Sequence, residues 1–224
     1  MEIAQLVLNG IMAGTILAIP AIGLTALFAV LRFTNFALAS HMTIGAYGGY
    51  LANTMLGLPI VPALVAAFLV AGLVGMISDE IVLKPLRAAG FITTAIGSIA
   101  LTIALENMIR FAFGNQMRGF DLPLRRDWVI NGLRVSPQQV ENLIIAVIVM
   151  AMLFAFLALT RTGKAMRAVA DNPMLAAIKG IDADMVARIV SFVAMGLAGL
   201  GGMLIGLDTT IDPLVGFKTI LSVF

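Results

Sequence analysis

The fold is decided by the stretch Phe33–Ser78, which reads FTNFALASHMTIGAYGGYLANTMLGLPIVPALVAAFLVAGLVGMIS and contains no Asp, Glu, Lys or Arg. A helix rises about 1.5 Å per residue and the hydrocarbon core of a bilayer is about 30 Å thick, so about 20 apolar residues make one crossing. The stretch is therefore long enough for two crossings. The segment Asn53–Pro62, which contains Gly57 and Pro59, is the natural break between them.

Charge-free runs outside this stretch predict the other crossings. The expected membrane helices are residues 3–31, 34–52, 60–78, 91–113, 140–160 and 187–207. We therefore predict an all-α polytopic membrane protein, a bundle of at least six transmembrane helices that forms one domain over residues 1–224. Pro20 and Gly23 predict a kink or an unwound turn in the first helix. Glu106 and Arg110, four residues apart in the fourth helix, can pair.

The composition supports the same class. Of 224 residues, 61% are hydrophobic and 12% are charged, and the mean hydropathy is +1.06, beyond what a water-soluble protein can bury. A net charge of +2 provides no basic face for nucleic acid. The chain has no cysteine and one histidine, so we expect no disulfide and no metal site. The partner that the composition does require is the lipid bilayer.

The two ends of the chain and its loops indicate how it is placed in the membrane. Met1 and Glu2 provide no basic segment of a cleavable signal, so we expect the first helix to remain. The apolar stretch at residues 214–224 has no stop signal, and we interpret the sequence as truncated at its C-terminus. Alternating crossings put the external loop, residues 114–137, opposite Arg32 and the loops at 79–87 and 161–188. The positive-inside rule favours the latter side as cytoplasmic.

The loop at residues 161–186 contains the signals of a short helix. Asn172 can cap its start, Pro173 suits its first position, and Gly180 can end it in the left-handed conformation. Lys179 falls in its last turn, where a cation is favourable.

On this short helix Met174, Leu175 and Ile178 form one apolar ridge. The helix is too short to cross a bilayer, so the ridge indicates either a protein partner or a helix lying in the membrane interface, and the pattern alone favours neither. Before the helix, Gly163, Lys164 and Arg167 give a basic face that suits an acidic protein groove or lipid phosphates.

The opposite loop predicts a β-hairpin outside the membrane. Asn131-Gly132 lies between Trp128–Ile130 and Leu133–Val135, and Asn-Gly between β-formers is a strong hairpin signal. We expect Trp128 near the membrane interface. The hairpin is either a docking element for an external protein or an ordered connection, and the second is favoured because two strands alone are only marginally stable.

Small residues four apart mark three helix faces. These are Gly10, Gly14 and Ala18; Ala67, Ala71 and Gly75; and Ala194, Ala198, Gly202 and Gly206. Such faces let helix backbones approach closely in lipid, and we interpret all three as packing surfaces.

Two segments resemble a known family. Arg32–Tyr47 (RFTNFALASHMTIGAY) and Gly163–Ile181 (GKAMRAVADNPMLAAIKGI) are similar to the Liv-type permease subunits of branched-chain amino acid ABC transporters. The resemblance covers nearly the whole chain in helix order and implies an inverted-repeat ABC permease fold in the bacterial inner membrane. Of the two surfaces that could cover the ridge, a protein partner or the membrane interface, the resemblance implies a protein partner, an ATPase. The implied coupling residues are Gly163, Lys164, Arg167, Ala168, Asp171, Pro173, Met174, Leu175, Ala176, Ile178 and Gly180.

The resemblance also implies the partners. These are cytoplasmic ATP-binding subunits, a second permease subunit that is homologous or identical, and a periplasmic or extracellular substrate-binding protein. The chain itself has no Gly-x-x-x-x-Gly-Lys-Ser/Thr segment to hold nucleotide phosphates, so we expect it to be no enzyme and to bind no cofactor.

The implied function is translocation of small solutes, with branched-chain amino acids as the first choice. Urea, amide and simple-sugar permeases are the alternative; an ion-coupled secondary transporter is less supported, because mid-helix acidic residues are nearly absent. A polar solute needs uncharged hydrogen-bonding groups along an apolar bundle. The candidates are Asn35, Ser40, Thr43, Tyr47 and Asn107.

The single histidine, His41, does not stand at the position where the family has its histidine. The family usually has Asn-Phe-Ala-His-Gly where this chain has Asn35–Ala39, so its histidine role does not transfer here. His41 lies three residues beyond the family position, which moves its side chain about 60° around the helix. We therefore expect His41 to pack. For Asp208 and Asp212 we expect positions at the water boundary.

Overall fold

The computed structural model describes residues 2–121, 128–130 and 133–223, which are mainly helical. Five helical stretches among them have the length and apolar composition to cross a membrane, which matches five of the six expected crossings. Helices satisfy every backbone polar group internally, which the hydrocarbon core demands. The five stretches are Ile3–Leu31, Ile60–Arg87, Phe91–Phe113, Pro137–Leu159 and Ala183–Asp208.

Three of the long helices differ from prediction in their details. Helix α1 (Glu2–Leu31) runs through Pro20 without a break, so the expected unwound turn is absent. Helix α3 (Ile60–Ser78) continues through a π-helical turn, η2 (Asp79–Leu83), into α4 (Lys84–Arg87). Helix α9 (Ala183–Asp208) begins four residues before the expected 187. Asp182 sets that start, because its side chain accepts hydrogen bonds from the Asp184 and Met185 amides.

Helix α5 (Phe91–Phe113) has the predicted bounds, and α6 (Pro137–Leu159) begins slightly before the expected 140. Pro137 occupies the first turn of α6, where its missing N–H costs no hydrogen bond.

The predicted helix over residues 34–52 is the one that differs most from the structure. Helix α2 spans only Leu38–Tyr50 and passes into a π-helical turn, η1 (Leu51–Met55). Its 13 α-helical residues rise about 20 Å, less than a full crossing. The segment before it is a turn, because Arg32 has a left-handed backbone (φ 59°) that ends α1 and the Asn35 Oδ1 accepts a hydrogen bond from the Ala37 amide.

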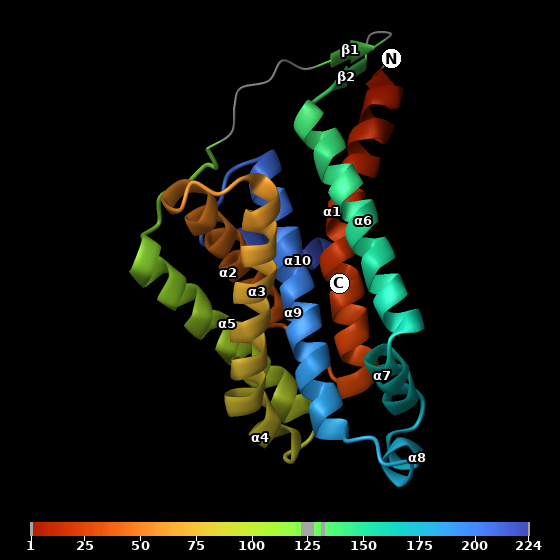
Figure 1. The fold of residues 1–224 in the computed structure, drawn as a ribbon. Coiled ribbons are helices and arrows are strands. Elements are labelled where there is room, and N and C mark those ends of the chain that lie inside the picture. The colour runs from red at the N-terminus through yellow and green to blue at the C-terminus, as the bar shows by residue number, and fades with distance from the viewer. Residues whose placement is uncertain (1, 122–127, 131–132, 224) are drawn as a thin grey trace.

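Helix α9 lies at the centre of the bundle and packs against α1, α2 and α3 (Figure 1). Close backbone approach makes this possible. A Cβ added to Gly45 of α2 would lie 2.1 Å from the Gly199 Cα of α9, and one added to Gly202 would lie 2.0 Å from the Met42 carbonyl oxygen. Backbones this close gain dispersion contacts, which hold helices together where lipid removes the hydrophobic drive.

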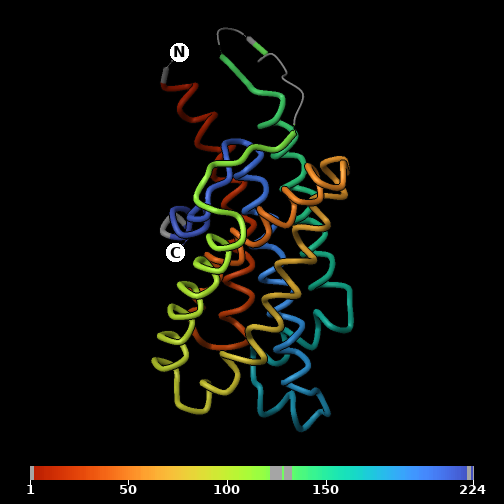
Figure 2. The backbone as a smooth tube through the Cα atoms, turned by 90° about the vertical axis from the view of Figure 1, so that its left-hand side faces the viewer, coloured from red at the N-terminus to blue at the C-terminus, as the bar shows by residue number. Residues whose placement is uncertain are grey.

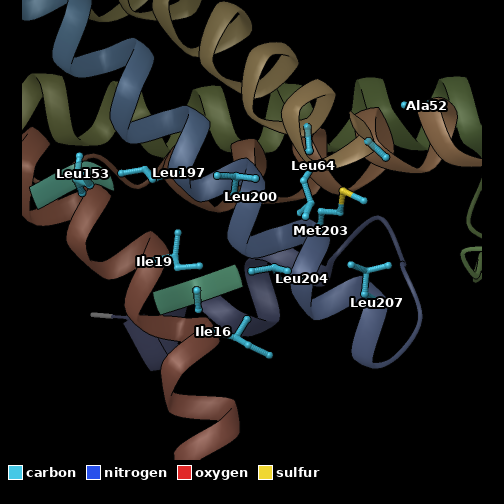
Figure 3. Close-up of a cluster of buried hydrophobic side chains, with 13 residues drawn as sticks. Ile16, Ile19, Ala52, Leu64, Leu153, Leu197, Leu200, Met203, Leu204 and Leu207 are labelled. Atoms are coloured by element: carbon cyan, nitrogen blue, oxygen red, sulfur yellow. The ribbon is translucent and has the colours of Figure 1, made fainter. Parts of the chain in front are cut away.

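Apolar side chains fill the space around α9. Figure 3 shows Ile16 and Ile19 of α1, Leu64 of α3 and Leu153 of α6 directed toward Leu200 and its neighbours on α9. These side chains form one contiguous cluster of buried residues. The core of the molecule therefore surrounds α9, which is itself mostly buried.

Two of the three small-residue faces pack as expected. Ala67 and Ala71 of α3 lie against Gly199, while Ala194 and Ala198 of α9 are fully buried. The face of α1 does not pack in this way, since no neighbouring atom of the described residues lies within 4 Å of a Cβ added at Gly10 or Gly14. Spacing alone therefore cannot say whether a small-residue face has a partner.

The bundle has two distinct ends. Strands β1 (Trp128–Ile130) and β2 (Leu133–Val135) pair antiparallel, with Trp128 opposite Val135, and lie beyond the helices at the end that holds the N-terminus, here called the hairpin end (Figures 1 and 2). The predicted hairpin is thus confirmed, although its turn, 131–132, lies outside the described residues. Helices α4, α7 (Arg161–Asp171) and α8 (Pro173–Ile178) lie at the opposite end, called the α8 end (Figure 1). A last helix, α10 (Val215–Val223), packs against α2.

Candidate coupling surface and transport path

Helix α7 occupies the part of the 161–186 loop for which the sequence predicted only a basic face. Thr160 caps it by accepting a hydrogen bond from the Gly163 amide at 3.0 Å. Gly163 is required by the sharp turn from α6, because a Cβ there would lie 2.4 Å from the Phe156 carbonyl oxygen. The first residue of the predicted coupling motif thus fixes the direction in which α7 leaves the bundle.

One face of α7 is buried and the other is charged and exposed. Met166 and Val169 pack into a core cluster, whereas Lys164, Arg167 and Asp171 are exposed. Ala168 is half-buried. An amphipathic helix of this kind lies along the bundle and presents its polar face outward. The structure therefore brings the predicted charged residues together on one surface.

Arg32 ties α7 to the end of α1. Its Nη2 donates a hydrogen bond to the Ala170 carbonyl oxygen at 2.6 Å. The Arg32 charge also lies at the C-terminal end of α7, where a cation is electrostatically favoured.

Helix α8 begins and ends at the residues that its sequence predicts. The Asn172 side chain accepts a hydrogen bond from the Leu175 amide at 3.0 Å, and Pro173 takes the first position. Gly180 has a positive φ of 81°, its amide donates to the Ala177 carbonyl, and the Ile181 amide donates to the Ala176 carbonyl. This pair of bonds is a Schellman motif, which satisfies carbonyl groups that the helix end would leave free.

The predicted ridge on α8 is exposed. Met174, Leu175 and Ile178 are 78%, 54% and 75% exposed, and only Ala176 of this helix is buried. Isolated exposed apolar residues are ordinary, but three on one turn of a six-residue helix form a patch that needs a covering surface. Helix α8 lies beside α7 at the α8 end of the bundle (Figure 1).

Ion pairs that sequence reasoning missed join α9 to the extension of α3. Arg188 binds both Glu80 oxygens, at 3.0 and 3.1 Å, and Lys84 binds Asp184 at 3.0 Å as well as Glu80 at 2.8 Å. The start of α9 follows α8 directly, so these charges hold the coupling region against α3. Helical spacing could have suggested the Glu80–Lys84 pair, whereas the contacts of Arg188 need the tertiary fold.

Four of the five predicted path residues lie on or just before α2. Ser40, Thr43 and Tyr47 are buried on that helix, and Asn35 is buried in the turn before it. Ser40 donates to the Ala37 carbonyl and Thr43 accepts from the Gly216 amide. Asn35 Nδ2 and the Tyr47 hydroxyl are buried without a hydrogen-bond partner among the described residues. An unpaired buried polar group is costly, and these two groups retain an unused capacity to form a hydrogen bond.

The fifth predicted path residue, Asn107, does not lie with the other four at α2. It is exposed on α5 and its side chain donates to the Ile103 carbonyl of its own helix. The polar face that α5 does bury was missed: Thr94, Ser98, Thr102 and Glu106 recur every four residues and are all buried. Ser98 accepts a hydrogen bond from the Phe36 amide beside α2. The four-residue spacing of these polar residues was the signal in the sequence that could have revealed this face.

Two further predictions on polar residues have clear outcomes. His41 is fully buried, with Nδ1 2.6 Å from the Ala37 carbonyl oxygen and Nε2 3.3 Å from the Ser78 hydroxyl, so it packs as expected. Glu106 and Arg110 interact electrostatically across one turn of α5 without a direct ion-pair contact among the described residues, and Glu106 Oε1 is buried without a hydrogen-bond partner there.

Comparison with known proteins decides the family. The model of the family described as "Branched-chain amino acid transport system / permease component" matches residues 6–224. The chain belongs to this family. The permease is 26% identical to the high-affinity branched-chain amino acid transport system permease protein BraD of Pseudomonas aeruginosa, over 98% of this chain and 76% of that one. No solved structure matches it significantly.

Other relatives carry the same kind of name. The high-affinity branched-chain amino acid transport system permease protein LivH of Escherichia coli K12 is 24% identical over the same shares of the two chains. The probable branched-chain amino acid transport permease protein LivH of Methanocaldococcus jannaschii is 28% identical, over 98% of this permease and 72% of that relative. Together with the five apolar helices, these matches identify the permease as a multi-pass membrane protein of a transport system and confirm the resemblance noted from its motifs.

Proposed function

We propose that this permease is the membrane-spanning subunit of an ATP-driven importer that carries branched-chain amino acids across the bacterial inner membrane. The family match supports the transport role, and the names of the relatives support the substrate class. The chain has no phosphate-binding Gly-rich loop, so ATP is hydrolysed by a separate subunit. The permease provides the path and two alternative shapes, and nucleotide binding in the partner drives the change between them.

The observation that carries the proposal is the exposed ridge on α8. The groove of an ATP-binding subunit buries Met174, Leu175 and Ile178, which pack as the apolar anchors of a helix-in-groove interface. Lys164 and Arg167 on α7 border this interface and match an acidic rim. The exposed coupling residues therefore form one continuous surface at the α8 end, with Gly163, Asn172 and Gly180 fixing its geometry.

The path itself runs along α2. Asn35 and Tyr47 provide unpartnered hydrogen-bonding groups toward either end of this short helix, with Ser40 and Thr43 between them. A second permease subunit, identical or homologous, completes the path, and a substrate-binding protein delivers the amino acid at the hairpin end.

The coupling role is tested by replacing Met174 and Ile178 with Asp in the assembled transporter. Two carboxylates on the ridge cannot enter an apolar groove, so we expect loss of most ATP-driven leucine uptake, roughly tenfold or more. The measurement is uptake of radiolabelled L-leucine into vesicles, with the amount of membrane-inserted permease determined in parallel. The ridge side chains are exposed, so the bundle should remain folded.

The matched control is Met55→Asp with Leu56→Asp. These residues are 71% and 72% exposed; Met55 ends the π-helical turn η1 beyond α2 and Leu56 follows it. Uptake should change little in this variant. Normal uptake by the α8 variant at normal protein levels would remove the coupling assignment.

A further inference from the structure

A pocket of about 310 Å³ lies at the hairpin end, between the C-terminal end of α5, the segment that follows it and the start of α10. This volume is at the lower end of the range for small-molecule sites. The two loops that form its walls are joined, because Arg118 and Ile211 exchange backbone hydrogen bonds at 2.9 and 2.8 Å. The pocket is therefore a fixed feature of this end.

The charged groups that line the pocket differ in the contacts that they already make. Asp212 binds Lys218 and also accepts a hydrogen bond from the Leu214 amide at 2.7 Å. Arg110, which lines the same pocket, makes no direct ion pair or hydrogen bond through its guanidinium among the described residues, and it interacts electrostatically with Glu106 one turn earlier on α5. A guanidinium matches a carboxylate with two parallel hydrogen bonds. A charged side chain on an apolar helix is costly and is retained where it has a function.

The pocket also has apolar lining residues. Met117, Pro213 and Leu214 line it, together with Lys218 and the polar Asn115. A cation, a carboxylate and an aliphatic wall in one small cavity match the three parts of an aliphatic α-amino acid. We propose that this pocket is the first binding site for the substrate in the permease, with Arg110 binding its carboxylate, Asp212 its ammonium group, and Met117 and Leu214 its side chain.

The pocket also adjoins the predicted path. Gly216, two residues after Leu214, donates its amide hydrogen bond to Thr43 of α2 at 3.1 Å, and a Cβ there would lie 1.8 Å from the Ala39 carbonyl oxygen. The start of α10 is thus pressed against the face of α2 that holds the path residues. On the α5 side, Glu106 lies one turn from Arg110, and its Oε1, which has no hydrogen-bond partner among the described residues, provides the next acceptor for an ammonium group.

This site rests on the proposed function, and its test separates the two. Radiolabelled L-leucine is bound to the assembled permease in nanodiscs without a binding protein, and leucinamide, which lacks the carboxylate, competes. We expect Arg110→Gln to weaken leucine binding about tenfold or more, because a charged hydrogen bond is lost. The wild-type preference for leucine over leucinamide should disappear with it. Arg134→Gln, an exposed arginine at the same end, is the matched control and should bind normally.

A second variant keeps the site testable if Arg110→Gln inserts poorly into the membrane. Met117 is 70% exposed in a loop, so Met117→Trp should fold and should weaken leucine binding by filling the apolar wall. Absence of leucine binding by the wild-type permease, or equal binding by Arg110→Gln, would overturn the site. Failure of the wild-type transporter to take up leucine at all would instead overturn the proposed function.

Discussion

At the scale of single residues, glycine at the α2–α9 crossing decides how closely the two helices approach. Gly45 and Gly199 meet with no room for a Cβ on either. A Cβ on Gly45 would meet the Gly199 backbone, and a Cβ on Gly199 would meet the Ala71 Cβ and the Ala67 carbonyl oxygen. None of these atoms can move aside as the far end of a flexible side chain would. A methyl group at this crossing must therefore separate the helices.

We predict that Gly45→Ala lowers the stability of the permease by about 1–3 kcal/mol, the usual cost of overpacking. The apparent melting temperature in detergent measures the change. Gly10→Ala is the control, since it has open space around it and gains helix propensity, so its melting temperature should be unchanged or higher. Equal melting temperatures for the two variants would contradict the packing described.

At the scale of elements, α8 is a helix whose existence depends on its caps. Six residues are too few to form a stable helix from propensity alone. The Asn172 cap at one end and the Gly180 stop at the other provide the local stabilisation, and Ala176 provides its one buried contact.

We predict that Asn172→Ala makes α8 open more often, because loss of a cap costs about 1 kcal/mol, equivalent to about a fivefold change in the opening equilibrium. Hydrogen exchange of the amides at 176–181 measures this. Asn172→Ser retains a capping oxygen and should exchange nearly as the wild type does. Unchanged exchange in the alanine variant would mean that α8 is held by contacts other than its cap.

The same elements show what could be predicted from sequence. Apolar runs and end signals located α5 and α8 well, because length, Pro, Gly and Asn act locally. The start of α2 was placed four residues early, because a charge-free run contains no information on where the chain turns, and the left-handed Arg32 and the Asn35 turn decide that. The contacts of Arg188 and the place of Arg110 in the pocket depend on which helices become neighbours, which no local pattern contains.

At the scale of the whole molecule, α9 connects the two functional ends. It begins directly after α8, where Asp184 and Arg188 are bound to the α3 extension, and it ends beside the loop that forms the wall of the pocket. It is also the most buried of the five long helices. The surface proposed for the ATPase and the site proposed for the substrate are therefore at opposite ends of one central, tightly packed helix (Figure 1).

The central claim, that α8 docks into an ATP-hydrolysing subunit, has a direct test because the chain contains no cysteine. A single Met174→Cys substitution gives a unique attachment point for a short photoactivatable crosslinker in the assembled transporter. We predict a crosslinked product with the ATP-binding subunit for Met174→Cys and none for Met55→Cys at the other end of the bundle. Crosslinking of Met174→Cys only to lipid, or to a protein at the hairpin end, would contradict the account.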